Sequence, residues 1–149
     1  MTGIGTISEI LSRKGSTVWS IDPDDMVFEA IQMMADKNVG ALLVMRAGKL
    51  LGLVSERDYT RKVALKGKSS RETPVRDIIS APVITATPED TVEECMRLMT
   101  HHRVRHLPVV DGETVIGIVS IGDLVNWTIS VQTVAISQLE GYISGNYPG

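Results

Sequence analysis

The sequence contains few aromatic residues and a single cysteine. Phe, Trp and Tyr together make up 4% of its 149 residues, so the core must be built from aliphatic side chains. The lone cysteine, Cys95, excludes a disulfide within the chain and disfavours a cysteine-based metal cluster. This cysteine usage fits a reducing compartment.

Long apolar runs and blocks of positive charge are also absent from the sequence. No apolar stretch reaches the ~18 residues that a membrane span needs, and the N-terminus lacks the pattern of a signal peptide. The net charge is −3, and no Lys/Arg block exceeds two adjacent residues, which disfavours nucleic-acid binding. We therefore expect a cytoplasmic protein with neither membrane nor nucleic acid as a partner.

An internal repeat occupies most of the chain. Residues 22–59 align with residues 87–124 at a constant offset of 65 without a gap, and twelve positions are identical. A unit of this length that occurs only twice is not a solenoid, which needs three or more shorter units. The repeat predicts two similar halves around a pseudo-two-fold axis, with paired clefts between them.

Each half has the pattern of a strand, a helix, two strands and a second helix, which places the chain in the α/β (α+β) class. The Pro and acidic residues at 22–25 and 87–90 are typical of helix starts. The other expected elements are turns or short helices at 7–11 and 75–79, extended segments at 17–21 and 83–86, helices ending near Lys37 and His102, strands at 41–45, 50–54, 107–110 and 115–119, and helices after Ser55 and Ser120. We divide the chain into repeats at 5–66 and 73–130, a linker at 67–72, and a C-terminal helix and tail at 131–149.

A motif of Gly, an apolar residue, Val, Ser and an Asp three residues later ends the hairpin in both copies, at 52–58 and 117–123. It places a hydroxyl and free backbone N–H groups at a helix N-terminus, an arrangement that suits a phosphate. The Asp one turn inside can accept hydrogen bonds from the hydroxyls of a ribose. The same residues also form a capping box that only stabilises the helix, and the motif by itself leaves both interpretations open.

The halves differ just before their first hairpin strand. The second half has Arg103-Val104-Arg105-His106 where the first has Asn38-Val39-Gly40-Ala41. Across the pseudo-two-fold axis, Arg105 and His106 could reach over the helix start at Ser55, next to Arg57, and form a cationic site for phosphates. The alternative is a solvated basic loop. The spacing of the three histidines fits no helical metal-binding pair.

These motifs resemble a tandem pair of cystathionine-β-synthase (CBS) domains, a Bateman module. The resemblance is carried by the His-Leu-Pro-Val-Val-Asp run at 106–111 and by Gly-Ile-Val-Ser-Ile-Gly-Asp-Leu at 117–124, and it covers about residues 5–130. It is closest to stand-alone bacterial and plant-organelle CBS pairs. The resemblance implies two pseudo-symmetric β-α-β-β-α repeats that form one module.

The resemblance also implies ligands and their sites. Family members bind adenosyl ligands such as AMP, ADP, ATP, NAD or S-adenosylmethionine between the repeats, and no cofactor is required. Carried over, site one comprises Ser55, Arg57, Asp58, Arg105, His106 and, near adenine, Val83; site two comprises Ser120, Asp123, Val39, Gly40 and, near adenine, Thr17 and Val18. Site two lacks the cationic pair and is expected to bind more weakly. Family members form dimers through their helices, so we expect a homodimer and an effector protein that senses the ligand.

The sequence gives little support to catalysis. The sequence has neither a Gly-x-Ser-x-Gly elbow nor a phosphate-binding P-loop, and Cys95 lies on an apolar helix face. The favoured interpretation is therefore a non-catalytic, ligand-sensing regulatory module. Two alternatives stay open: a protein-interaction scaffold whose Ser-x-x-Asp motifs are structural caps, and a small nucleotide hydrolase that uses His101, His102 or His106.

Overall fold

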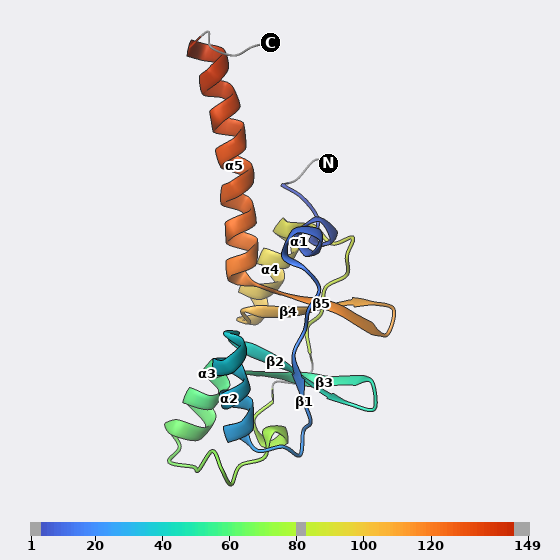
Figure 1. The fold of residues 1–149 in the computed structure, drawn as a ribbon, viewed down its shortest axis with the longest axis vertical. Helices are drawn as coiled ribbons and strands as arrows, with labels where there is room; N and C mark the ends of the chain where they lie inside the picture. Colours follow the sequence, from blue (N-terminus) through green and yellow to red (C-terminus); the bar gives the residue numbers. More distant parts are fainter. Residues whose placement is uncertain (1–3, 80–82, 145–149) are drawn as a thin grey trace.

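The computed structural model describes residues 4–79 and 83–144, and it places the two repeats one above the other (Figure 1). Each half contains a β-hairpin with helices packed against it. The elements in chain order are α1 (Ile7–Lys14), β1 (Ser20–Ile21), α2 (Val27–Lys37), β2 (Ala41–Arg46), β3 (Lys49–Ser55), α3 (Glu56–Tyr59), a π-helical turn (Thr60–Ala64), a 3-10 turn (Val75–Asp77), α4 (Val92–His102), β4 (His106–Asp111), β5 (Thr114–Ser120) and α5 (Ile121–Ser144). This is the mixed α/β architecture that the sequence predicts.

The two hairpins share one register. Ala41 lies opposite Ser55 at the open end of the first hairpin, and His106 lies opposite Ser120 at the same place in the second. The short strand β1 adds to the first sheet in parallel to β2. In the second half, Ala86 makes only an isolated bridge at the equivalent place. The repeat in the sequence is therefore a repeat in the fold.

Helices α2 and α4 end where the sequence predicts but begin later. In the second half, the Asp90 N–H donates to the Thr87 carbonyl at 3.1 Å, and the Thr87 N–H donates to the Asp90 carboxylate at 2.8 Å. These bonds close a turn, and α4 begins only after Thr91, which forms a capping box with Glu94. Residues 22–25 form the equivalent turn before α2. The predicted helix starts at 22–25 and 87–90 were wrong because an Asp side chain can cap a turn as well as a helix.

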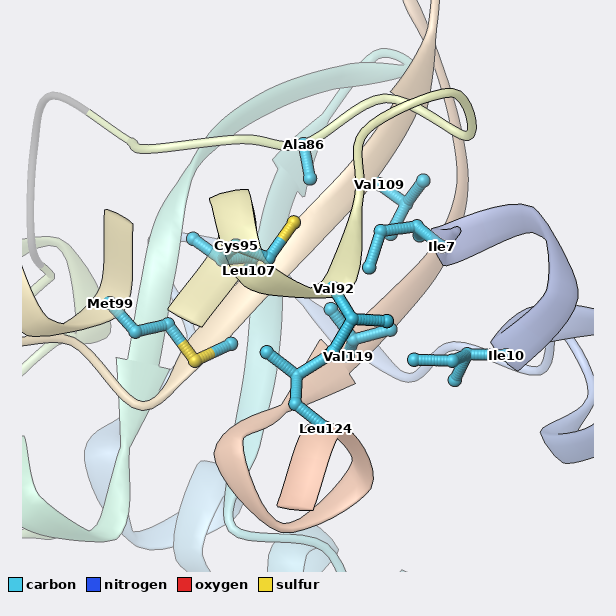
Figure 2. Close-up of a cluster of buried hydrophobic side chains, with 10 residues drawn as sticks. All are labelled: Ile7, Ile10, Ala86, Val92, Cys95, Met99, Leu107, Val109, Val119 and Leu124. Carbon is cyan, nitrogen blue, oxygen red and sulfur yellow. The ribbon is translucent and has the colours of Figure 1, made fainter. Parts of the chain in front are cut away.

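Two buried clusters form the core, one in each half. The first contains Ile21, Val27, Ala30, Met34, Leu42, Val44, Val54, Val63, Val75 and Ile78. The second contains Ile7, Ile10, Ala86, Val92, Cys95, Met99, Leu107, Val109, Val119 and Leu124 (Figure 2). Residues of α1 therefore pack in the second half, and residues 75–78 pack in the first. We call α1 and residues 75–78 the crossed segments.

Backbone hydrogen bonds hold both crossed segments in place. The Ile7 N–H donates to the Asp90 carbonyl at 2.9 Å, and the Val75 N–H donates to the Asp25 carbonyl at 2.8 Å. Each bond joins a crossed segment to the turn that precedes the main helix of the half it packs on. The core of each half is therefore complete only with its crossed segment, α1 in the second half and residues 75–78 in the first.

Helix α5 is continuous through position 131, where the sequence analysis begins a separate tail. It extends well past the body of the second half (Figure 1). Within the described part of the chain, no helix is long and apolar enough to cross a membrane.

We expect Ile7→Ala to lower the free energy of unfolding by about 2–5 kcal/mol, because it leaves a cavity in the core of the second half. Ile7 is fully buried although it lies far from that half in the sequence. Urea denaturation measures the change, and Ser12→Ala on the exposed side of α1 is the matched control. A loss for Ile7→Ala no larger than that of Ser12→Ala would contradict the crossed packing.

Candidate ligand-binding site

The first motif forms a closed capping box where β3 meets α3. The Asp58 carboxylate accepts from the Ser55 N–H and from the Ser55 hydroxyl, each at 3.0 Å, and the Asp58 N–H donates to Ser55 Oγ at 3.2 Å. The Asp58 side chain is only 13% exposed. The carboxylate is therefore held in one orientation at the helix start.

The second motif has the same geometry where β5 meets α5. The Ser120 N–H donates to the Asp123 carboxylate at 2.8 Å, and the Asp123 N–H donates to Ser120 Oγ at 3.1 Å. The two halves thus present the same pair of groups, a hydroxyl and a carboxylate, at equivalent helix starts. These bonds confirm the capping role of both motifs, and a ligand role stays a prediction.

Each motif carboxylate also pairs with a lysine. Lys62 Nζ lies 3.1 Å from Asp58 and donates to the Ile78 carbonyl at 3.0 Å. Lys14 Nζ lies 2.5 Å from Asp123 and donates to the Ile118 carbonyl at 2.8 Å. Sequence reasoning missed Lys14. It lies at the end of α1, so only the crossed packing brings it to the second motif.

A hollow of about 200 Å³ gathers three arginines between the halves. It is lined by Arg57, Met99, Thr100, Arg103, Val104, Arg105 and Ile121. The Arg57 guanidinium donates to the Arg103 carbonyl at 3.1 Å, which joins α3 of the first half to the end of α4 in the second. Arg57 and Arg105, which the sequence analysis expects together, thus share one hollow. Because Ile121 follows Ser120 directly, the hollow borders the second motif as well as the first.

Arg103 adopts a backbone conformation that disfavours its own side chain. It caps α4 in the left-handed region, with φ +56°. The equivalent residue in the first half is Asn38, a residue type that tolerates this region well. Such strain persists only where the surrounding structure enforces it, and here Arg103 also lines the arginine hollow.

His106 lies at the boundary between the halves. A methyl group built on Gly40 would lie 3.6 Å from its Nε2 atom, so the imidazole of the second half approaches the backbone of the first. Burial lowers the pKa of His106 below its ordinary value of 6.5, and the positive charge of Lys14 lowers it further. The negative charges of Asp123 and Asp58 act on the same ring in the opposite direction. His106 therefore lies within the field of both motifs.

The other predicted site residues lie in different surroundings. The Gly40 carbonyl accepts from the Glu56 N–H at 3.1 Å, as the Arg105 carbonyl accepts from Ile121 at 2.9 Å in the other half. Val39 packs against the first core. The remaining three are Thr17, which is exposed, and Val18 and Val83, which are half-buried. Residues 81 and 82, which precede Val83, lie outside the described residues.

A larger hollow of about 780 Å³ lies elsewhere, along the outer face of α4. It is lined by Asp90, Glu94, Met96, Arg97, Leu98, Thr100 and His101. None of the predicted site residues lines it. His101 and His102 lie at the exposed end of α4 with their rings edge to face, 4.8 Å between centroids. Cys95 is buried in the second core, as predicted, and burial raises the pKa of its thiol to about 12.

The two halves, with their matching hairpins and Ser-Asp caps, both match one family model. The family model for the CBS domain matches residues 4–65 and 75–130. The chain belongs to the CBS-domain family. It is a CBS pair, and the resemblance seen in its sequence is confirmed.

Relatives of this CBS pair include a curated protein and a solved structure. The CBS domain-containing protein CBSX3, mitochondrial, from Arabidopsis thaliana is 41% identical over 152 residues, which cover 95% of this chain and 73% of the relative. A solved protein with CBS domains from Burkholderia ambifaria MC40-6 is 46% identical with a TM-score of 0.81, covering 84% of this chain and 94% of that one.

A more distant structure was solved with ligands. The CBS domain pair of protein MJ0100, in complex with 5-methylthioadenosine and S-adenosyl-L-methionine, has a TM-score of 0.75 at 23% identity. It covers 86% of this chain and 98% of that one. At this identity the likeness concerns the fold.

We expect Arg103→Gly to stabilise the CBS pair by about 0.5–1 kcal/mol, because glycine adopts the left-handed conformation without a steric penalty. Thermal or urea unfolding measures the change. Asn38→Gly is the matched control and should change stability less, since Asn already tolerates this conformation. Destabilisation by Arg103→Gly would show that the Arg103 side chain contributes more to folding than its backbone strain removes.

The stability of the protein should fall as the pH drops below about 6.5, in part because of His106. Its folded-state pKa is lowered, so the unfolded chain takes up this proton first, and stability is fully present only above the unfolded-state pKa. His106→Gln should flatten this part of the curve of unfolding free energy against pH, measured by urea denaturation. Equal slopes for the variant and the wild-type protein would contradict the buried position of the imidazole.

Proposed function

We propose that this CBS pair is a non-catalytic regulatory module that binds an adenosyl ligand in the clefts between its repeats. The observation that carries the proposal is the repeated Ser-Asp cap, in which the same two backbone N–H groups donate in both halves, next to a hollow lined by three arginines. The candidate ligands are AMP, ADP, ATP, NAD and S-adenosylmethionine. The ligand-bound structure of the MJ0100 pair supports this ligand class.

In site one, the ribose hydroxyls would donate to the Asp58 carboxylate, and Ser55 and the start of α3 would face the phosphates. Arg57 and Arg105 would contribute charge to the phosphates, because guanidinium groups bind them through paired hydrogen bonds. His106 would lie beside them, and Val83 would lie near the adenine. The two arginines line one hollow, which supports a role for both toward the same anion.

In site two, Asp123 and Ser120 would take the corresponding roles, with Val39 and Gly40 contributed by the other repeat. Thr17 and Val18 would lie near the adenine. The sequence analysis expects weaker binding here because Gly40 replaces an arginine. The Lys14 ammonium adds a cation to this site, so a phosphorylated ligand fits it better than the sequence alone indicates.

Ligand binding would require an exchange of partners at both carboxylates. Asp58 and Asp123 are paired with lysines, and a ribose would replace these ion pairs with two hydrogen bonds. The released ammonium groups would then be available to the phosphates. This exchange favours ligands that carry both a ribose and an anionic group.

The regulatory mechanism we propose is a population shift. A ligand that binds one arrangement of the two repeats more tightly favours that arrangement, and an effector protein would detect the change. We further propose a homodimer as the functional unit and a cytoplasmic location, although the Arabidopsis relative is named as mitochondrial.

A protein-interaction scaffold is the second candidate. It is favoured by the closed capping boxes, since each motif Ser and Asp already has partners within the chain. A scaffold predicts no thermal shift with any nucleotide, whereas a ligand at 100 times its Kd stabilises the protein by about 2.7 kcal/mol.

Calorimetric titration with AMP, ADP, ATP, NAD and S-adenosylmethionine tests the proposed function. We expect Asp58→Asn to weaken binding at site one about tenfold or more, because a hydrogen bond to a charged group contributes about 1.5–3 kcal/mol. Asp111→Asn, at the exposed end of β4, is the matched control. Arg105→Ala should weaken ATP binding more than AMP binding.

Three outcomes would contradict the proposal. The first is no binding of any of these ligands at concentrations up to about a millimolar. The second is wild-type affinity in the Asp58→Asn and Arg105→Ala variants, which would refute the site assignment. The third is turnover of a bound nucleotide, detected by chromatography, which would indicate an enzyme.

A further inference from the structure

A single ammonium group in site one connects the motif carboxylate to the segment on the adenine side. Lys62 Nζ lies 3.1 Å from the Asp58 carboxylate and donates to the Ile78 carbonyl at 3.0 Å. Ile78 belongs to the crossed segment that leads toward Val83, near which we place the adenine. The Lys62 ammonium therefore holds the ribose side and the adenine side of the proposed site together.

Lys14 makes the equivalent connection in site two. Its Nζ lies 2.5 Å from the Asp123 carboxylate and donates to the Ile118 carbonyl at 2.8 Å. Lys14 is the last residue of α1, and Thr17 and Val18, which we place near the adenine, follow it closely in the chain. Each site thus has one ammonium group that joins its carboxylate to the adenine-side segment.

The repeat does not supply these two lysines. At the offset of 65 residues, Trp127 stands at the position of Lys62, and Ile79 stands at the position of Lys14. Both copies of the repeat contain the carboxylate, but each half obtains its ammonium group from a different segment of the chain. The pairing is therefore a property that the two sites share and not a by-product of the repeat.

Both ion pairs are shielded well enough to oppose a competing ligand. The side chains of Asp58 and Asp123 are 13% and 26% exposed, and those of Lys62 and Lys14 are 43% and 32% exposed. Water screens a fully exposed pair, whereas a largely buried carboxylate with a charged hydrogen-bond donor gains more from its partner. A ribose that takes the carboxylate must therefore offset the lost ion pair, and the displaced ammonium needs a new anion.

The group on the 5′ carbon of the ribose decides whether that anion is available. This group lies beside the ribose and hence close to the displaced ammonium. A phosphate offers the ammonium a new negative charge, and the hydroxyl of adenosine offers none. The sulfonium of S-adenosylmethionine places a second positive charge beside it. The 5′ group should therefore rank these ligands from phosphate through hydroxyl to sulfonium.

We propose that Lys62 and Lys14 select adenosyl ligands by the charge of the 5′ group, so that the sites accept nucleotides and reject adenosine and S-adenosylmethionine. This inference rests on the proposed function and narrows its ligands to nucleotides. The cations at the boundary then have separate roles. Arg57 and Arg105 add affinity for the phosphates, and the two lysines penalise a ligand that carries no phosphate.

Calorimetric titration of the full chain with AMP, adenosine and S-adenosylmethionine tests the selection. We expect the double variant Lys14→Met with Lys62→Met to bind adenosine and S-adenosylmethionine at least about fivefold more tightly than the wild-type protein, because neither ligand then displaces an ammonium group. The affinity for AMP should change less, since the variant loses the competing ion pair and the contact with the phosphate together. The ratio of AMP affinity to adenosine affinity should therefore fall.

Two further variants separate charge from folding. Lys66→Met with Lys68→Met is the matched control, because both lysines are exposed in the linker, and all three affinities should stay unchanged. Lys14→Arg with Lys62→Arg keeps both positive charges and should keep the wild-type preference for AMP. The single Met variants each alter one site and give the same comparison if the double variant does not fold.

Two outcomes would overturn the selection and leave the proposed function intact. One is an unchanged ratio of AMP affinity to adenosine affinity in the Met variants. The other is wild-type binding of S-adenosylmethionine as tight as that of AMP. No binding of any of the three ligands to the wild-type protein would instead refute the proposed function, and the selection with it.

Discussion

The exchange of the two crossed segments is the constraint on which the rest of this CBS pair depends. Ile7 and Ile10 complete the core of the second half, and Val75 and Ile78 complete the core of the first. Each half therefore buries a segment that is close in the sequence to the other half. The exchange also places a crossed segment near each motif, because Lys14 of α1 pairs with Asp123, and Lys62, the partner of Asp58, donates to the Ile78 carbonyl.

The electrostatics of the boundary follow from the same exchange. Lys14 reaches Asp123 only because α1 packs on the second half, while Lys62 pairs with Asp58, which lies four residues earlier in the chain. The two motif carboxylates thus have equivalent partners from unrelated parts of the chain. The arginines, in contrast, come mostly from the second half. The boundary is symmetric in its carboxylates and ammonium groups and asymmetric in its guanidinium groups.

Departures from the repeat concentrate at the arginine hollow and in the helices that follow the two motifs. The left-handed position that holds Asn38 in one half holds Arg103 in the other, which adds backbone strain and a cation. The helix after the first motif becomes a short π-helical turn and ends at Ala64, whereas α5 continues to Ser144. Shared positions maintain the fold, and the differences at the hollow are the features on which the proposed ligand contacts depend.

The sequence by itself determined the repeat, the hairpins, the helix ends and the capping motifs, because apolar periodicity and capping residues act over a few neighbouring positions. It also indicated that Arg57 and Arg105 would lie together, since the pseudo-symmetry relates the two halves. The tertiary structure alone decided which half each crossed segment packs on and the place of Lys14. These features depend on contacts between segments that are distant in the sequence. An apolar stripe indicates that one face of a helix is buried, but it does not indicate which segment packs against that face.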